Sequence, residues 1–552
     1  MPEQDSPPGG QGGAEPWNPL YESRPRYAGA LLHITSLPGP YGIGDLGAEA
    51  RAFADFLASA GISLWQILPL GPTGYGNSPY AARSSFAGNE LLLSPELLAR
   101  EGLLGEEELT ERRRALSGEG PGGANRVDYG LVEEQKLPLL REAARRFAAL
   151  LDGGGTETPA NAGERAAFKA FCEREAHWLD DYALFQVLYR RYGDARWHTI
   201  WDASLARREK AALEKVREEK AAEILEWKIL QYFFERQWRD LKAYANGRGI
   251  RIIGDIPIFV APDSADSWTR IDLFKTGADG KYSVVSGVPP DYFSPTGQLW
   301  GNPVYDWEKM KAGGFSWWID RIRRLLAQVD IFRIDHFRGF DAYWAVPAGD
   351  STAERGTWEP GPGEEFFRVL KRELGELPVL AEDLGFLTES VKKLREGAGF
   401  PGMKVCQFGF EDMKEGRLDA RHSFLPHNYD YPWAAYTGTH DNNTTAGWYA
   451  ALGGADKRTV AAYFGLERAG GGTEGELPPP GEAAWAMVRS VMASHAKYAI
   501  FPLQDLLGLG AEARINTPAT CGGENWSWRL EALPPRELAR RFASLVSLYG
   551  RR

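Results

Sequence analysis

Eight short apolar runs, separated by stretches of helical character, limit the folds open to this chain. They occupy residues 29–38, 64–72, 250–260, 330–337, 378–385, 403–410, 433–441 and 498–508. Nearly continuous apolar strands that alternate with helices are typical of a parallel sheet covered on both faces. Eight such units predict an α/β chain folded as a (β/α)8 barrel, also called a TIM barrel.

Several of these runs end in acidic residues. In a barrel of this kind the catalytic groups lie at the C-terminal ends of the strands. The acids at or near those ends are Asp255, Asp335, Glu382, Asp383, Asp441 and Asp505. One such acid is explained by capping of the following helix, whereas several on one rim predict a functional site.

The barrel does not account for all 552 residues. Residues 73–249 are too long for a simple crossover, and their last part, 204–248, has a strongly helical pattern. The sequence therefore predicts large, mainly helical insertions at about 73–249 and 261–329, within a catalytic unit that spans residues 28–552. Residues 1–27 contain no apolar signal-peptide core and are predicted to form a disordered N-terminal tail.

The composition disfavours several classes of protein. A net charge of −11 argues against nucleic acid as a partner, since nucleic-acid-binding proteins usually carry a basic face. No uncharged apolar run approaches the ~20 residues of a membrane helix, so we expect no membrane partner and a cytoplasmic location. Cys172, Cys406 and Cys521 form no metal-binding pattern and are predicted to be reduced. We expect no cofactor and no metal, and the sequence does not predict an oligomeric state.

Longer motifs in the chain resemble a known family. They are LPGPYGIGDLG (37–47), WQILPLGPTGYGNSPY (65–80), GDIPIFVAPDSADSW (254–268), GVPPDYFSPTGQLWGNPVYDW (287–307), FRIDHFRGF (332–340), LAEDLG (380–385), YTGTHDNNT (436–444), RINTPAT (514–520) and NWSWR (525–529). Together they resemble the 4-α-glucanotransferases, or amylomaltases, of glycoside hydrolase family seventy-seven in the α-amylase clan. The resemblance runs from about residue 28 to the C-terminus. It implies retaining transfer of α-1,4-glucan segments between maltodextrins, without a cofactor.

The resemblance implies roles for three carboxylates. Asp335 matches the nucleophile, Glu382 the general acid/base, and Asp441 the carboxylate that holds the sugar in the transition state. Retaining transfer through a covalent glycosyl–aspartate requires two carboxylates about 5–5.5 Å apart. Asp335 and Glu382 would lie on adjacent strands, which are ~4.7–4.9 Å apart, so their placement suits a retaining mechanism.

The two acids must differ in charge before reaction. Arg333 lies two residues before Asp335, hence on the same side of the strand, where it would keep Asp335 ionised. Glu382 must instead be protonated when the leaving oxygen departs, so its surroundings should raise its pKa. On spacing alone, Arg333 and Asp335 are equally consistent with a structural ion pair at the barrel rim.

The resemblance also implies a set of substrate-binding residues. His440 and His336 would line the cavity near the cleavage point, and Tyr80 would form an aromatic platform under the donor sugar. The remaining members are Arg333, Asp255, Asn516 and, from residues 287–307, Asp291, Gln298, Trp300 and Asn302. The prolines and glycines of 287–307 predict a shaped loop rather than a helix or strand. In the family this loop lies over the cleft and contacts the acceptor sugar, which would restrict the access of water to the intermediate.

Three alternatives remain open at this point. An α-1,4-glucan hydrolase of the same clan would use the same acids with water as acceptor, and would create reducing ends. A magnesium-dependent barrel would bind metal through Asp255, Asp335, Glu382 and Asp441, and a chelator would inactivate it. A glucan-binding protein without catalysis would bind glucan and release no product.

Overall fold

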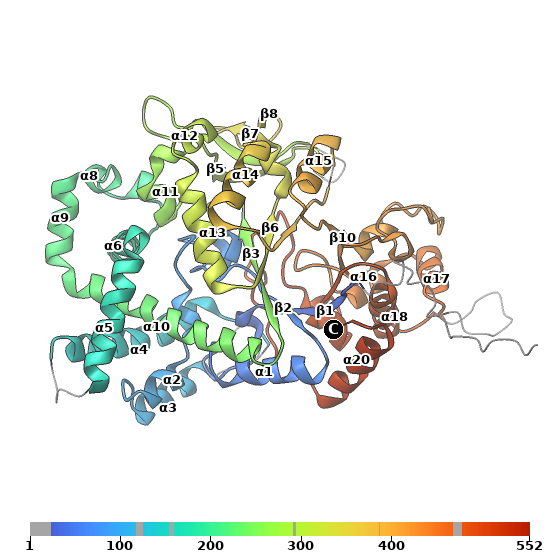
Figure 1. Cartoon of the computed structure of the whole chain (residues 1–552), viewed down its shortest axis with the longest axis horizontal. Helices are drawn as coiled ribbons and strands as arrows, with labels where there is room; N and C mark the ends of the chain where they lie inside the picture. Colours follow the sequence, from blue (N-terminus) through green and yellow to red (C-terminus); the bar gives the residue numbers. More distant parts are fainter. Residues whose placement is uncertain are drawn as a thin grey trace, which may run out of the picture.

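The computed structural model describes residues 24–117, 125–153, 159–290, 294–385, 387–466 and 477–551. Within them an eight-stranded parallel sheet curls into a nearly closed barrel (Figure 1), in the order β10-β11-β12-β1-β2-β3-β6-β9. Its strands are β1 (Tyr27–Leu31), β2 (Leu64–Gln66), β3 (Arg251–Pro257), β6 (Ile331–Asp335), β9 (Val379–Ala381), β10 (Met403–Val405), β11 (Ala434–Tyr436) and β12 (Tyr498–Pro502). Seven of the predicted apolar runs contain one of these strands, and the run 29–38 overlaps β1, so the predicted TIM barrel is confirmed.

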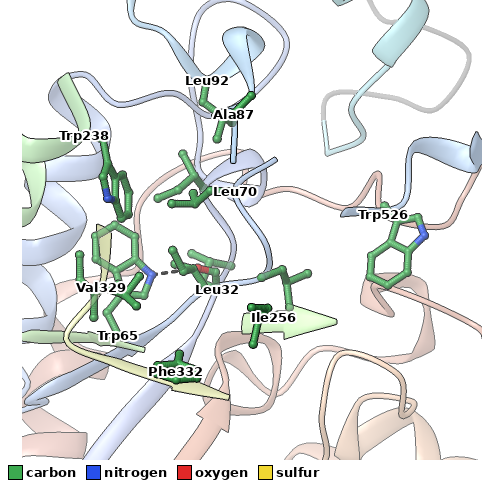
Figure 2. Close-up of a cluster of buried hydrophobic side chains, with 14 of the residues drawn as sticks. Leu32, Trp65, Leu70, Ala87, Leu92, Trp238, Ile256, Val329, Phe332 and Trp526 are labelled. Carbon is green, nitrogen blue, oxygen red and sulfur yellow. Dashed lines mark hydrogen bonds between the residues drawn. The ribbon is translucent and has the colours of Figure 1, made fainter. Parts of the chain in front are cut away.

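Alternate residues of the barrel strands serve two different cores. Leu64, Ile253 and Ile331 belong to a small cluster that fills the barrel. Their neighbours Trp65 and Phe332 point outward into the large core under the helices (Figure 2). Successive side chains of a strand face opposite sides, so strands that are apolar at consecutive positions are required to fill both cores.

Two buried tryptophans of the outer core are hydrogen-bonded to backbone carbonyls. The Trp65 indole N–H donates to the carbonyl of Leu32 at 2.8 Å (Figure 2). The Trp238 indole N–H donates to the carbonyl of Gln328 at 2.9 Å. An unpaired buried donor would destabilise the fold by ~1–3 kcal/mol, so these bonds let large amphipathic rings fill the core.

The seam of the barrel lies between β9 and β10, and Asp383 bridges it. The Ala381 N–H donates to the carbonyl of Pro401 at 2.8 Å, and the Asp383 carboxylate accepts the Met403 N–H at 2.8 Å. Arg395, on helix α15 (Glu389–Gly397), lies 3.0 Å from the same carboxylate. Asp383 is therefore a structural acid of the seam, whereas its neighbour Glu382 accepts a hydrogen bond from the His336 N–H at the end of β6.

Asp505 is also structural. It lies in α19 (Leu503–Leu507) and is fully buried. Its carboxylate accepts hydrogen bonds from the Thr437 hydroxyl at 2.5 Å and from the Thr445 N–H at 2.6 Å. Two of the six acids noted at strand ends thus stabilise the barrel and its connections instead of entering the site.

A helical segment separates β2 from β3. Its helices are α2 (Pro95–Arg100), α3 (Glu106–Leu116), α4 (Tyr129–Leu151), α5 (Pro159–Arg174), α6 (Ala176–Tyr192), α7 (Trp197–Ile200), α8 (Ala203–Ala206), α9 (Lys210–Glu219) and α10 (Ala221–Asn246). Figure 1 shows them beside the barrel, with α10 returning the chain to it. One face of α10 carries buried aromatic residues such as Trp227 and Phe234, and the other face is charged. The buried aromatic face anchors the helical segment.

The second segment between strands departs from the expectation of a mainly helical insertion. It contains α11 (Ala265–Thr269), β4 (Val284–Val288), β5 (Gln298–Pro303) and α12 (Trp307–Ala312). The strands β4 and β5 join β7 (Ala342–Pro347) and β8 (Thr357–Pro360) in an antiparallel sheet of order β5-β4-β7-β8. Helix α13 (Ser316–Gln328), which falls inside the predicted 261–329 insertion, directly precedes β6 and belongs to the barrel.

The prediction that residues 287–307 form a shaped loop, without helix or strand, is wrong at residues 287–288, which end β4, and at residues 298–303. Residues 298–303 form β5, an edge strand that pairs with β4. An edge position tolerates a proline such as Pro303, and Gly297, with φ +68°, supplies the turn before the strand. Pairing with β4 overrides the local signal of the prolines and glycines.

Helices cover the remainder of the barrel. They are α1 (Ala48–Ser59), α14 (Gly363–Leu374), α15, α16 (Thr445–Ala451), α17 (Gly454–Tyr463), α18 (Pro480–Ala493), α19 and α20 (Arg536–Leu548). Near the end of the chain Arg551 is buried and donates to the carbonyls of Met492 at 2.7 Å and Ala496 at 2.9 Å. No helix in the described ranges is long and apolar enough to cross a membrane.

The boundary of the predicted N-terminal tail needs a correction. Tyr27, its last residue, is the first residue of β1. Arg26 is already attached to the body, because it donates to the carbonyl of Ser494 at 2.9 Å. Residues 1–23 lie outside the described residues.

The seam gives a stability prediction. Asp383→Asn keeps an acceptor for the Met403 N–H but leaves Arg395 without its buried counter-charge, the side chains being only 1% and 7% exposed. Breaking a buried pair from one side destabilises strongly, so we expect a loss of roughly 3 kcal/mol in unfolding free energy, measured from the urea midpoint. The matched control is Glu373→Gln in the exposed Arg372–Glu373 pair, with an expected change within about 0.5 kcal/mol. Equal midpoints for the two variants would contradict the role of Asp383.

Candidate active site

The strand register brings three acidic positions to one part of the rim. Asp255 of β3 lies opposite Arg333 of β6. On the other side, Ile334 of β6 lies opposite Ala381 of β9, which places Asp335 and Glu382 at the ends of neighbouring strands. Neighbouring strands are ~4.7–4.9 Å apart, close to the spacing that a retaining carboxylate pair requires.

Arg333 links two of these carboxylates. Its Nη1 donates to Asp255 Oδ2 at 2.7 Å, and its Nη2 donates to Asp335 Oδ1 at 2.8 Å. Arg333 and Asp255 are buried, whereas the Asp335 side chain is 29% exposed. The positive charge of the guanidinium is thus paired with two carboxylates. Of these two, the carboxylate of Asp335 faces the cavity.

Asp255 in turn holds Tyr80, which lies in the short helix η4 (Pro79–Ala81). The Tyr80 hydroxyl donates to Asp255 Oδ2 at 2.9 Å. Burial raises the pKa of Asp255 to about 6, against the opposing effect of Arg333. Asp255 therefore positions Arg333 and Tyr80 from beneath.

Glu382 has a different environment from Asp335. Its carboxylate accepts two backbone hydrogen bonds, from the His336 N–H at 2.7 Å and the Leu384 N–H at 2.9 Å. Burial raises the pKa of Glu382 to about 7, helped by the charge of Asp335 and opposed by Arg333 and the backbone donors. Two neighbouring acids with contrasting surroundings are the arrangement from which acid and base roles are assigned.

His336 adopts a strained backbone between the two acids. Its φ of 53° and ψ of 50° lie in the left-handed region, which costs about 1–3 kcal/mol for a residue other than glycine. This conformation aims its N–H at Glu382. Burial lowers the pKa of its imidazole to about 4, so the ring is neutral at pH 7 and can both donate and accept hydrogen bonds.

Asp441 is held by residues from the end of the chain. Asn516 Nδ2 donates to Asp441 Oδ1 at 2.7 Å, and Arg514 donates to the Asp441 carbonyl at 2.7 Å. His440 Nε2 lies 3.4 Å from Asp441 Oδ2. Partial burial would raise the pKa of Asp441, but His440, Asn516 and Arg333 together hold it well below its usual range.

Aromatic rings form a wall beside these carboxylates. Tyr80 and His440 are stacked, with ring centroids 5.1 Å apart and an interplanar angle of 17°. Trp526 lies 5.7 Å from Tyr80 and 5.9 Å from His440. Trp526 and Arg514 belong to motifs noted in the sequence, NWSWR and RINTPAT, but neither residue was among the predicted site residues.

The antiparallel sheet covers the site from the other side. Trp300 of β5 meets the His336 ring edge-on at 4.8 Å and is 39% exposed. Its indole N–H lies 3.4 Å from the Gln298 side-chain oxygen. Asn302 donates to the carbonyl of Val260 at 2.9 Å. Asp291 lies outside the described residues.

One cavity of about 900 Å³ connects these walls, a volume typical of a ligand site. Among its lining residues are Tyr80, Trp300, Asn302, Asp335, His336, Asn516 and Trp526. Within the described part of the chain, no group of three His, Cys, Asp or Glu residues is placed to hold a metal ion. A magnesium site would need four acids, and two of them, Asp255 and Asp335, already accept hydrogen bonds from Arg333. These bonds disfavour the magnesium alternative.

Carboxylates in contrasting environments, beside stacked rings at the C-terminal rim of a barrel, are the arrangement of barrel enzymes that act on glycosidic bonds. A family model described as 4-alpha-glucanotransferase, glycoside hydrolase family 77, matches residues 32–534. The chain belongs to this family.

Individual relatives agree over almost the whole chain. The 4-alpha-glucanotransferase of Thermus thermophilus is 47% identical over 509 residues, which are 92% of this chain and 95% of that protein. The 4-alpha-glucanotransferase of Synechocystis sp. is 45% identical over 532 residues, 96% of this chain and 98% of that protein. An amylomaltase from Streptococcus agalactiae in complex with acarbose has a TM-score of 0.85 and 38% identity, with 95% and 99% of the two chains covered. The family and the enzyme activity that the sequence motifs imply are confirmed.

The raised pKa of Glu382 can be measured directly. The infrared band of protonated carboxyl groups should lose one component as the pH rises through about 7, and Glu382→Gln should remove that component. Asp255→Asn should weaken the component that is lost near pH 6, to which the buried Asp266 also contributes. The control is Glu389→Gln: Glu389 is exposed, and Lys392 lowers its pKa, so this variant should leave the spectrum above pH 6 unchanged. A component near pH 7 that persists in Glu382→Gln would refute the assignment.

Proposed function

We propose that this chain moves segments of α-1,4-glucan between maltodextrins, starch or glycogen chains, with retention of configuration and through a covalent glycosyl–Asp335 intermediate. The observation that carries the proposal is the pairing of Asp335, bonded to the buried Arg333 at 2.8 Å, with the neighbouring Glu382, whose pKa is raised to about 7. Membership of the 4-alpha-glucanotransferase family supports the same conclusion.

The first half of the reaction breaks one glycosidic bond. An Asp335 oxygen attacks the anomeric carbon, and the bond from that carbon to the leaving oxygen breaks as Glu382 transfers its proton to that oxygen. The fragment with the reducing end leaves, and Glu382 is now ionised. Arg333 neutralises the charge of Asp335 in the free enzyme and orients the attacking oxygen.

The second half reverses these steps with a different partner. Ionised Glu382 accepts the proton of the 4-hydroxyl of an incoming glucan, and that oxygen attacks the anomeric carbon. The bond to Asp335 breaks, and the new α-1,4 link forms. One glycosidic bond is broken and one is made, so no water is consumed.

The other predicted residues would hold the sugar during these steps. Asp441, held ionised by its neighbours, would bind hydroxyls of the reacting sugar together with His440, while the stacked Tyr80 ring would lie under it. Negative charge near the reacting carbon stabilises the positive charge that develops in the transition state. Asp255 and Asn516 would position Arg333, Tyr80 and Asp441.

Transfer rather than hydrolysis depends on the residues over the cleft. Trp300, 39% exposed beside His336, would stack on the acceptor sugar, with Gln298 and Asn302 supplying polar contacts. An occupied acceptor position limits the access of water to the intermediate. The hydrolase alternative would need this acceptor position to be weak.

We also propose a cytoplasmic location. All three cysteines, Cys172, Cys406 and Cys521, are free thiols. Unpaired cysteines are typical of a reducing compartment.

The acid role of Glu382 is tested with an activated donor. Glu382→Gln should lose more than ~10³-fold in kcat on maltotriose, the scale for removing a member of a catalytic unit. It should still react with α-maltosyl fluoride, because fluoride leaves without a proton, and mass spectrometry should find the added sugar on the peptide that contains Asp335. The control is the Asp335→Asn, Glu382→Gln double variant, which should trap nothing. Equal loss on both donors by folded Glu382→Gln would exclude the acid role.

Counting reducing ends separates transfer from hydrolysis. Maltotriose should give glucose and a ladder of longer maltodextrins while total reducing ends barely rise, since each bond broken is matched by one made. Trp300→Ala should raise the hydrolytic fraction, because the acceptor loses its stacking surface. A matched control is Trp358→Ala, at an exposed tryptophan of the same antiparallel sheet outside the cavity lining. A steady rise in reducing ends without products longer than maltotriose would overturn the transferase proposal and leave the hydrolase.

A further inference from the structure

The cavity extends past Asp335 to a second wall. This wall consists of Tyr189 near the end of α6, Asp194 and Arg196 in the connection from α6 to α7, and Pro262 and Asp263 after β3. The same cavity is lined by Asp335 and Trp300 at its other end. The catalytic mechanism uses none of the five residues of the second wall.

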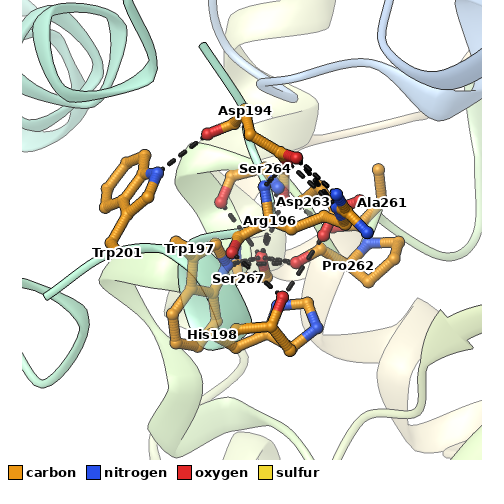
Figure 3. Close-up of polar contacts among 11 residues, drawn as sticks. Asp194, Arg196, Trp197, His198, Trp201, Ala261, Pro262, Asp263, Ser264 and Ser267 are labelled. Carbon is orange, nitrogen blue, oxygen red and sulfur yellow. Dashed lines mark hydrogen bonds and ion pairs between the residues drawn. The ribbon is translucent and has the colours of Figure 1, made fainter. Parts of the chain in front are cut away.

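Asp194 and Arg196 form a rigid polar fork on this wall (Figure 3). The Arg196 N–H donates to Asp194 Oδ1 at 2.8 Å, and its Nε and Nη2 donate to the same carboxylate at 3.0 and 2.5 Å. The Arg196 side chain is 58% exposed. Among the described residues no hydrogen bond engages its Nη1, so a donor remains for a ligand in the cavity.

Buried tryptophans fix the fork to the barrel. The Trp197 indole N–H donates to the carbonyl of Pro262 and to the Ser267 hydroxyl, each at 3.1 Å. The Trp201 indole N–H donates to the carbonyl of Asp194 at 2.8 Å (Figure 3). A polar group that is already held in place loses little entropy when it binds a ligand.

The second wall is also tied to the Tyr80 platform. Arg83, three residues after Tyr80, donates to the Tyr189 hydroxyl at 2.9 Å, with its guanidinium 4.3 Å from the centroid of that ring. The Arg83 carbonyl accepts the Ala265 N–H of α11 at 2.8 Å. The helical segment and the barrel loops therefore form one continuous surface along the cavity.

The charges on the second wall suit an uncharged ligand. Asp194 and Asp263 contribute two carboxylates, and Arg83 and Arg196 two guanidiniums, all lining the cavity. Burial lowers the pKa of His198, which packs against Asp263, so this imidazole is neutral at pH 7. Balanced charges give no net attraction for phosphates or other anions, whereas paired donors and acceptors match the vicinal hydroxyls of a sugar.

We propose that the second wall binds glucose units of a glucan chain beyond those next to the cleavage point, with Arg196 as the principal donor, so that it favours long over short substrates. This inference rests on the proposed function for the identity of the ligand. A glucan of seven glucose units occupies more of the cavity than one of three, so contacts at the second wall benefit the longer chain.

The experiment compares binding of maltoheptaose and maltotriose. Both are titrated calorimetrically into Asp335→Asn protein, which should not turn them over, with and without Arg196→Ala. We expect Arg196→Ala to weaken maltoheptaose binding about 5-fold more than maltotriose binding, on the scale of one hydrogen bond from a charged group. In the otherwise unchanged enzyme, the ratio of kcat/KM for the two substrates should shift by the same factor, mainly through KM.

The chain offers a matched control in Asp419 and Arg421. This pair has the same Asp-x-Arg geometry, with the Arg421 N–H, Nε and Nη2 at 3.0, 3.1 and 3.3 Å from the carboxylate. It does not line the cavity. Arg421→Ala should leave the length ratio at its original value.

A second variant keeps the test decisive if Arg196→Ala disturbs the fold. Arg196→Lys retains the positive charge but not the planar fork, and should show the same length-selective loss. Equal losses for the two glucans, or no loss, in a folded Arg196 variant would overturn the proposal. Failure of the proposed function is seen separately, as a steady rise of reducing ends with the unchanged chain, and leaves this binding comparison valid.

Discussion

The buried guanidinium of Arg333 connects most parts of the site to the barrel. Arg333 belongs to β6 and donates to Asp255 on the neighbouring strand β3. It also donates to Asp335 at the end of β6. A buried positive charge without partners would be strongly destabilising, so both carboxylates are required where they are. Asp255 also receives the Tyr80 hydroxyl, and the position of the aromatic wall thus depends on the same ion pair.

Glu382 illustrates how the surroundings of a carboxylate set its pKa. Glu382 lies one strand away from Asp335. Two backbone N–H groups donate to Glu382, whereas the guanidinium of Arg333 donates to Asp335. Burial outweighs the opposing effects of Arg333 and of these backbone donors, so the pKa of Glu382 rises to about 7. The left-handed backbone of His336 is the local strain that makes this arrangement possible.

The barrel supplies the acids, and the inserted segments supply the cleft. Trp300 comes from the antiparallel sheet, Asp194 and Arg196 from the helical segment, and Asn516 and Trp526 from the end of the chain. Binding residues are commonly carried on connections that a rigid scaffold positions. The buried tryptophans Trp197 and Trp201 extend that rigidity to the connection after α6, which is why a polar fork there can act on a ligand without first becoming ordered.

The sequence by itself determined the eight barrel strands, since a continuous apolar run is a local property of the sequence. Together with the family motifs, it also predicted Asp335, Glu382 and Asp441 as the acids of the site. Only the tertiary structure separated these acids from Asp383 and Asp505, because acids at strand ends look alike until their partners, Met403 and Thr445, are in place. The same holds for β5, whose prolines and glycines predict a loop until β4 pairs with it. Trp526 and Arg196 enter the cavity because segments distant in sequence are packed together, and no local pattern encodes that proximity.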